Sequence, residues 1–215
     1  MTVDQETASD ARATQHRATL PALLTGWAET LGDQPAFTRV EPGGVSRSWS
    51  WRELDTWVST VAAMLAGRLN TGARVALLAS QGLEYAVGFL GALRAGVITV
   101  PLFPPGRPGG NGGLRTVLGD CRPALALTTR ADQRTVTEFV GPYLAVVAVE
   151  DIPAAAPRDW PEPDPQSVAY LRYNLGSAGA PAGVTHADVV ANARQNIDAY
   201  DPIGGGPAAF SWLPL

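Results

Sequence analysis

Cysteine and histidine are nearly absent from this sequence, which has one cysteine, Cys121, and two histidines, His16 and His186, among 215 residues. A single cysteine excludes an internal disulfide and suits a reducing compartment. One cysteine and two distant histidines also cannot provide the ligands of a zinc site. Because no histidine lies near Cys121 in the sequence, we interpret this cysteine as a small, partly buried residue and not as a nucleophile.

Long apolar runs and a strong net charge are absent as well. No stretch approaches the roughly 18 uninterrupted apolar residues of a membrane-spanning helix, and residues 1–19 lack the basic start and apolar core of a signal peptide. We therefore expect a cytoplasmic protein with no membrane span, whose polar residues 1–19 form a mobile tail. A net charge of -4 gives no electrostatic reason to expect a nucleic-acid partner.

The first ordered part of the chain predicts a helix, a hairpin and a second helix. Apolar residues at helical spacing between Leu20 and Leu31 form the first helix, with Pro21 in its first turn. Residues 36–40 and 45–49 read as the two strands of a β-hairpin around a Pro-Gly-Gly turn. Ser50 and Glu53 then form the capping box of the second helix. Three tryptophans are assigned to the core: Trp49, Trp51 and Trp57.

From Arg74 onward, short apolar runs alternate with helical patterns, and this alternation predicts an α/β fold built of βαβ units around a mostly parallel sheet. The predicted strands are 75–78, 97–102, 124–129 and 144–149, and the predicted helices are 83–95, 114–121 and 131–140. Ligands of such sheets bind beyond the carboxyl ends of the strands.

Two segments rich in proline or glycine interrupt this alternation. Residues 103–113 are expected to form an irregular loop, either a plain connector or a substrate-contacting loop. Residues 151–166 are expected to form a proline-rich connector. This connector would separate an N-terminal α/β subdomain, residues 20–150, from the start of a nucleotide-binding subdomain, residues 167–215, whose last residues 208–215 read as a buried strand.

The glycine-rich segment from Tyr170 to Gly183 is the candidate phosphate-binding site. It reads as a strand, a loop without regular structure and then a helix, which Thr185 can cap and whose first turn contains Asp188. Glycines allow backbone N–H groups to converge on one anion, and Ser177 adds a hydroxyl. Neither G-x-x-x-x-G-K-[ST] nor G-x-G-x-x-G occurs in the chain, so a plain strand-to-helix loop stays open as the alternative.

The same segment resembles the signature loop of adenylate-forming enzymes, typically Tyr-Thr-Ser-Gly-Ser-Thr-x-x-Pro-x-Gly-Val. Residues 49–54, 93–102 and 211–215 are similar to three other family segments, in the family's order. Residues 100–105, 181–184 and 211–214 look most like the fatty acyl-AMP ligase branch. The resemblance implies the N-terminal part of the adenylate-forming enzyme fold, with the rest of the active site beyond Leu215, so that this piece alone would be inactive.

The resemblance also implies the substrates and the site residues. The cofactor would be ATP with its Mg²⁺, the substrate a fatty acid, and the partner an acyl carrier protein or polyketide synthase that accepts the acyl group. Five residues of the loop would hold the ATP phosphates: Asn174, Gly176, Ser177, Ala178 and Gly179. No catalytic residue and no metal ligand is assigned within this chain.

The sequence also departs from the family pattern. Asn174, Leu175 and Ala178 stand where the usual loop has hydroxyl side chains, and loss of such hydrogen bonds weakens phosphate binding. Two alternatives therefore stay open beside a fatty acyl-AMP ligase: an acyl-CoA ligase or amino-acid adenylation domain, and a degenerate, non-catalytic scaffold or binding module. His186 is expected to cap or pack the helix, with an approach to the phosphates as the alternative.

Overall fold

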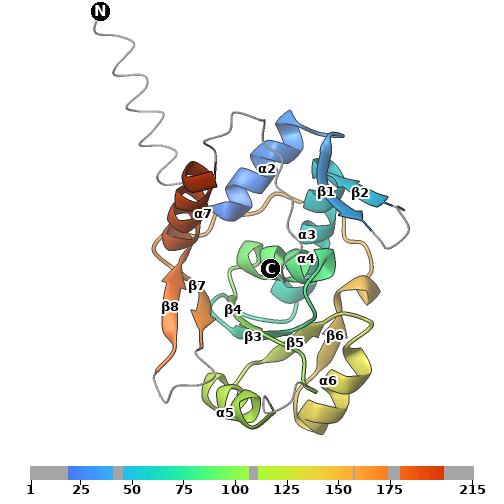
Figure 1. The fold of residues 1–215 in the computed structure, drawn as a ribbon, viewed down its shortest axis with the longest axis vertical. Coiled ribbons are helices and arrows are strands. Elements are labelled where there is room, and N and C mark those ends of the chain that lie inside the picture. The colour runs from blue at the N-terminus through green and yellow to red at the C-terminus, as the bar shows by residue number, and fades with distance from the viewer. Residues whose placement is uncertain (1–18, 41–45, 107–110, 157, 174–179, 201–215) are drawn as a thin grey trace, which may run out of the picture.

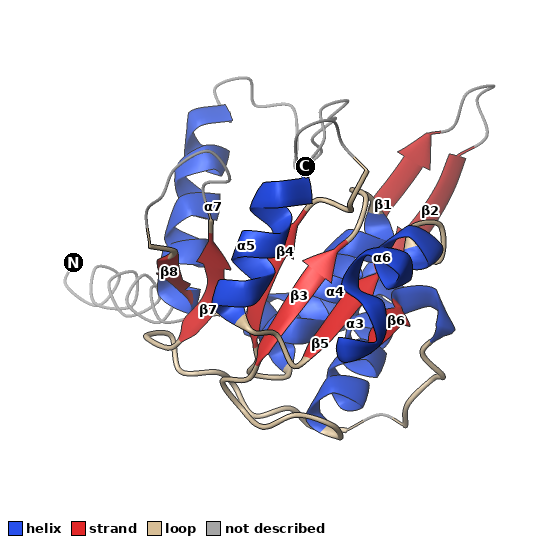
Figure 2. Cartoon of the chain, turned by 90° about the horizontal axis from the view of Figure 1, so that it is seen from below, coloured by secondary structure: helices blue, strands red, loops and turns tan. Residues whose placement is uncertain are grey.

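The computed structural model describes residues 19–40, 46–106, 111–156, 158–173 and 180–200, and these form a sheet between two layers of helices, with a separate hairpin (Figures 1 and 2). The helices are α2 (Leu20–Thr30), α3 (Trp51–Ala66), α4 (Leu83–Arg94), α5 (Asn111–Cys121), α6 (Gln133–Val140) and α7 (His186–Tyr200). The strands are β1 (Pro35–Val40), β2 (Ser46–Ser50), β3 (Arg74–Leu78), β4 (Ile98–Leu102), β5 (Leu125–Thr128), β6 (Val146–Ala148), β7 (Val168–Arg172) and β8 (Ala182–Thr185).

The main sheet has six strands in the order β6-β5-β3-β4-β7-β8. Its first five strands are parallel, with Arg74 of β3 opposite Ile98 of β4 and Val75 opposite Leu125 of β5. Only β8, at the edge, runs antiparallel to its neighbour β7. The predicted α/β class, mostly parallel sheet and early β-hairpin are confirmed, because β1 and β2 pair separately as an antiparallel hairpin.

The two faces of the sheet pack against different helices. Val75 and Leu77 of β3 lie in one core cluster with residues of α2, α3 and α4. Ala76 and Leu78 of the same strand lie in a second cluster with residues of α5 and α6. Successive side chains of a strand point to opposite faces, so the continuous apolar runs reflect strands that are covered on both sides, as Figure 2 shows.

Side chains cap the starts of two helices, α2 and α3. Ser50 Oγ accepts a hydrogen bond from the Glu53 N–H at 3.2 Å, and the Glu53 carboxylate accepts one from the Ser50 N–H at 2.8 Å, which confirms the predicted capping box of α3. Thr19, placed with the tail in the sequence analysis, is instead buried and caps α2. Its hydroxyl also donates to the Glu162 carboxylate at 3.4 Å, a contact with the distant proline-rich segment that local sequence does not reveal.

The predicted core position is confirmed for Trp49, and Trp51 and Trp57 are partly buried at the edge of the same core. Trp49 is 7% exposed, while Trp51 and Trp57 pack against the α2–α4 side of the sheet. Trp51 also lies 5.0 Å from Trp27 of α2, measured between ring centroids. These contacts join the hairpin, α2 and α3 to one apolar cluster.

Two predicted loops end earlier than expected. The loop prediction for residues 103–113 is wrong at its end, because α5 begins at Asn111, and the Asn111 side-chain oxygen accepts a hydrogen bond from the Gly106 N–H at 3.0 Å. The glycine-rich loop was expected to continue through Gly183, yet Ala182–Thr185 form β8. Alanine and glycine have weak strand propensity, but Ala182 and Gly183 form a strand here because their backbone pairs with β7.

The proline-rich segment contains no regular helix or strand between Pro153 and Ser167 among the residues that the structure describes. Its division of the chain into two subdomains stays a prediction, and β7 and β8 complete the same sheet as β3–β6. The strand expected at 208–215 lies outside the described residues. In the described part of the chain, no helix combines the length and apolarity needed to cross a bilayer.

Candidate functional site

The glycine-rich segment connects the two strands of a β-hairpin. Arg172 of β7 pairs with Ala182 of β8, and Tyr170 pairs with Val184. The predicted order of strand, loop and helix therefore missed one strand, because β8 lies between the loop and α7. Because β7 is parallel to β4, this hairpin turns at the carboxyl edge of the sheet, where open α/β sheets bind ligands.

The five residues predicted to hold phosphate, Asn174, Gly176, Ser177, Ala178 and Gly179, lie outside the described residues, so their role stays a prediction. The structure describes the residues on either side of them. Tyr173 precedes the segment and Ala180 follows it, and the pairing of β7 with β8 brings these two ends to one edge of the sheet.

The start of α7 is capped by three hydrogen bonds between Thr185 and Asp188. Thr185 Oγ1 accepts from the Asp188 N–H at 3.1 Å, and the Asp188 carboxylate accepts from the Thr185 N–H at 3.0 Å and from the Thr185 hydroxyl at 2.8 Å. These bonds hold the pKa of Asp188 below its usual value. Thr185 therefore caps the helix as predicted, and Asp188 is its capping partner.

His186, the first residue of α7, is buried with 2% of its surface exposed. The His186 backbone N–H donates to the Ser167 carbonyl at 3.1 Å, and the Ala187 backbone N–H donates to the Pro165 carbonyl at 2.8 Å. The first turn of α7 is therefore attached to the end of the proline-rich segment. Burial lowers the pKa of His186, although the Asp164 carboxylate opposes this shift. The packing role expected for His186 fits this position.

The buried imidazole makes the stability of this region depend on pH. Burial favours neutral His186 in the folded chain, so its contribution is fully present above the ordinary pKa of 6.5 and is lost as the pH falls below 6.5, where the unfolded chain binds a proton that the folded chain resists. We expect the urea midpoint of the protein to fall between pH 7 and pH 5, and less so in a His186→Gln variant. Equal pH dependence in both proteins would contradict this prediction.

An open hollow of about 580 Å³ lies against both strands of the hairpin, between α4 and α7. Its lining contains the aromatic and apolar residues Tyr85, Phe89, Pro101 and Tyr170 and the polar residues Arg172, Asp188, Asn192 and Asn196. The rings of Phe89 and Tyr170 meet edge to face, with centroids 5.8 Å apart. Tyr85 and Phe89 could not be predicted as lining residues from the sequence, because their spacing of four residues on one helix is equally typical of core packing.

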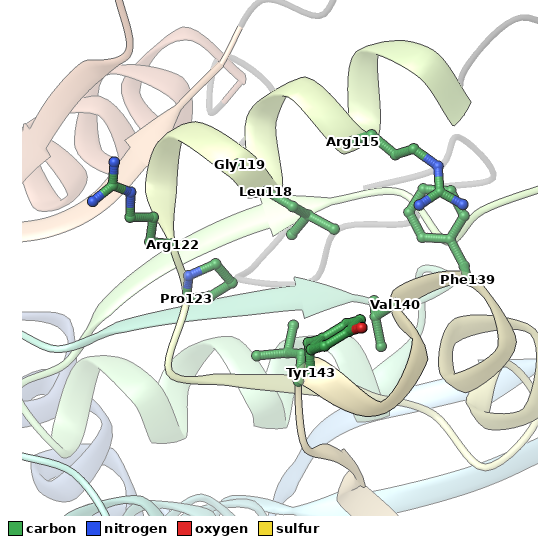
Figure 3. A pocket seen from close by; sticks show the side chains of 9 residues that line it. Arg115, Leu118, Gly119, Arg122, Pro123, Phe139, Val140 and Tyr143 are labelled. Carbon is green, nitrogen blue, oxygen red and sulfur yellow. The ribbon is translucent and has the colours of Figure 1, made fainter.

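A second hollow, of about 330 Å³, lies on the opposite side of the sheet between α5 and α6 (Figure 3). The Arg115 guanidinium lies over the Phe139 ring, 4.4 Å from its centroid, and joins the two helices. Tyr143, at the lining, is 93% exposed. This hollow contacts neither strand of the glycine-rich hairpin.

The described residues contain no cluster of histidine, cysteine, aspartate and glutamate side chains able to hold a metal ion. Cys121 is buried at the end of α5, and burial raises the pKa of its thiol to about 11. A thiol with this pKa is protonated at neutral pH and is a poor nucleophile. Its interpretation as a packing residue is confirmed.

Residues 24–215 match the family of AMP-binding enzymes, and the chain belongs to this family. Among its relatives, the long-chain-fatty-acid–AMP ligase FadD32 of Mycolicibacterium smegmatis is 37% identical over 92% of this chain and 34% of its own length. The long-chain-fatty-acid–AMP ligase FadD26 of Mycobacterium marinum is 37% identical over 91% of this chain and 36% of its own length. The chain thus spans about a third of the length of these relatives.

Solved structures show the same fold. A structure from studies of fatty acyl-adenylate ligases of E. coli and L. pneumophila is 28% identical, with a TM-score of 0.72 over 91% of this chain and 36% of that one. The nonribosomal peptide synthetase FmoA3, in an AMPPNP-bound form, is 20% identical, with a TM-score of 0.71 over 86% of this chain and 19% of that one. The fold alone therefore does not separate these enzyme classes, whereas the sequence identities lie with fatty-acid–AMP ligases.

Proposed function

We propose that this chain is part of a fatty acyl-AMP ligase, which activates a fatty acid with ATP and passes the acyl group to a carrier-protein thiol. The observation that carries this proposal is the identity of 37% with long-chain-fatty-acid–AMP ligases over more than nine tenths of the chain. The glycine-rich hairpin at the carboxyl edge of a parallel sheet supports it, because that edge is where such sheets bind nucleotides.

The reaction places simple demands on the protein. A carboxylate oxygen of the fatty acid attacks the α-phosphorus of ATP, the bond between the α-phosphorus and the bridging oxygen breaks, and pyrophosphate leaves. The carboxylate is ionised at neutral pH and needs no general base. Catalysis therefore depends on orienting the two substrates and on stabilising phosphate charge with donors. We propose that Gly176, Ser177 and Gly179 provide such donors to the β- and γ-phosphates, with Asn174 and Ala178 beside them.

The described residues fit ATP in two respects. The hairpin strands bring both ends of the glycine-rich segment together, and the adjacent hollow of about 580 Å³ combines aromatic and polar side chains, as nucleotide and small-molecule sites do. The Mg²⁺ that accompanies ATP would arrive with the phosphates, which supply oxygen ligands of their own.

The test uses the polypeptide as its host produces it. The intact mass of this polypeptide is measured first, and an adenylation assay follows. We expect formation of acyl-AMP and pyrophosphate from ATP and a long-chain fatty acid, and fatty-acid-dependent exchange of labelled pyrophosphate into ATP. Transfer to a carrier protein but not to coenzyme A is expected of an acyl-AMP ligase, while thioester formation with coenzyme A would identify an acyl-CoA ligase. Absence of adenylate across chain lengths, with no ATP binding, would support the degenerate binding module instead.

A further inference from the structure

Tyr173, the residue directly after β7, forms a hydrogen bond to α5, which is far from it in the sequence. The Tyr173 hydroxyl donates to the Asp120 carboxylate with an oxygen–oxygen distance of 2.5 Å, although the two residues are 53 positions apart. Tyr173 immediately precedes the predicted phosphate-binding residues, and Asp120 lies in the last turn of α5. A short hydrogen bond to a carboxylate is charge-assisted and about twice as strong as a bond between neutral groups.

The Asp120 end of this contact lies on a fixed support. Leu114, Val117 and Cys121 bury one side of α5 against the sheet. The Cys121 carbonyl accepts a hydrogen bond from the Arg74 side chain of β3 at 3.1 Å, which attaches the last turn of α5 to the central strand. On its other flank, α5 is joined to α6 by the stacking of Arg115 on Phe139 (Figure 3). Asp120 is therefore an acceptor held in place by the packed helix.

The Tyr173 hydroxyl is suited to donate this hydrogen bond. Its ring packs against the α5–α6 core cluster, and burial, followed by the Asp120 hydrogen bond, raises the pKa of its hydroxyl. The hydroxyl is therefore protonated throughout the physiological pH range and remains a donor. The end of β8 far from the segment is held separately, by the Thr185–Asp188 cap and by the bond from the His186 backbone N–H to the Ser167 carbonyl.

We propose that Tyr173 and Asp120 are positioning residues for ATP binding, because their hydrogen bond fixes the point at which β7 enters the phosphate-binding segment. This inference rests on the proposed function. The bond anchors the β7 end of the segment to α5, while the pairing of Arg172 with Ala182 holds β8, which follows the segment, beside β7. Backbone donors at fixed positions bind an anion without first losing conformational freedom, whereas donors on an unanchored chain must be ordered on binding.

The experiment measures steady-state kinetics of acyl-AMP formation by the full polypeptide and its variants. Tyr173→Phe, which removes only the hydroxyl, and Asp120→Ala are each expected to raise KM for ATP about tenfold, with KM for the fatty acid unchanged. Asp120→Asn keeps an acceptor oxygen and is expected to recover most of this loss. The double variant Tyr173→Phe with Asp120→Ala is expected to be no worse than Tyr173→Phe alone, because both remove the same bond.

Tyr143→Phe is the matched control, since it removes a hydroxyl from an exposed tyrosine away from the hairpin, and we expect it to leave both KM values unchanged. An unchanged KM for ATP in Tyr173→Phe would overturn the proposal. So would equal increases in both KM values together with a lower thermal midpoint, because that pattern indicates a structural role only.

Hydrogen exchange separates this proposal from the proposed function. Faster amide exchange in residues 168–172 and 182–185 of Tyr173→Phe, with α3 and α4 unaffected, is expected whether or not the wild-type polypeptide forms acyl-AMP. If the wild type forms no adenylate, the proposed function fails, and the anchoring of the hairpin is then judged by exchange alone. Unchanged exchange in both strands would overturn it.

Discussion

Replacing Arg94 with methionine is expected to lower the free energy of unfolding by about 3 kcal/mol. The side chain is 2% exposed and pairs with the Asp55 carboxylate at 2.6 Å. Its guanidinium also donates to the Ser59 hydroxyl at 2.7 Å, the Thr25 hydroxyl at 3.1 Å and the Pro21 carbonyl at 3.4 Å. These partners belong to α2 and α3, while Arg94 ends α4, so one charged group joins the three helices on this side of the sheet.

Methionine retains most of the side-chain volume but leaves Asp55 without its cation. Breaking a buried ion pair costs more than removing both charges, because the remaining carboxylate stays partly desolvated. We therefore expect Arg94→Met combined with Asp55→Asn to be more stable than Arg94→Met alone. Arg94→Lys is expected to be intermediate, since a single ammonium cannot reach acceptors on α2 and α3 together.

The measurement is urea unfolding followed by circular dichroism. Arg134→Met is the matched control, because Arg134 is an exposed arginine that pairs with Glu138 one helical turn away, and such a pair contributes little. Its midpoint is expected to equal that of the wild type. If Arg94→Met shifted the midpoint no more than Arg134→Met, the proposed role of Arg94 would be wrong.

Gly91→Ala is expected to destabilise the protein by about 2 kcal/mol, through overpacking. A Cβ at this position of α4 would lie 2.6 Å from the Cβ and Cγ1 atoms of Val61 on α3, closer than van der Waals contact allows. The Cβ of Val61 cannot rotate away, since it is fixed to the backbone. The two helices would have to separate, which opens the apolar contact between them.

Two other glycines provide a graded comparison for this prediction. A Cβ on Gly88 would lie 3.1 Å from a terminal methyl of Leu77, which can move, so Gly88→Ala is expected to cost less than Gly91→Ala. A Cβ on Gly26 of α2 would have no neighbouring atom within 4 Å, so Gly26→Ala is expected to stabilise the protein by up to about 1 kcal/mol. An order of unfolding midpoints other than Gly26, Gly88 and then Gly91 would contradict this explanation.

Much of the fold could be predicted because its signals are local. The capping box of Ser50 and Glu53 involves residues three positions apart, and the alternation of apolar runs with helical patterns from Arg74 onward records strands buried on both faces. The Thr185 cap of α7 was predicted for the same reason. The family could also be inferred, because the residues that carry its resemblance are contiguous segments.

The candidate site was predictable only in part. The glycine-rich segment identified the place, but β8 was missed because Ala182 and Gly183 have little strand propensity and become a strand through pairing with β7. Asp120 carried no signal, since a lone aspartate near the end of a helix is usually solvated. The hollow beside the hairpin likewise combines residues from α4, β4, β7, β8 and α7.

The sequence by itself therefore determined the class of fold, the capped starts of α3 and α7 and the family, since each depends on residues that are neighbours along the chain. Only the tertiary structure decided that Thr19 meets Glu162, that Arg94 joins three helices and that Tyr173 bonds Asp120. Such contacts depend on distances between residues far apart in sequence. Those distances are fixed by how the helices pack on the sheet, and no local pattern of residue types encodes them.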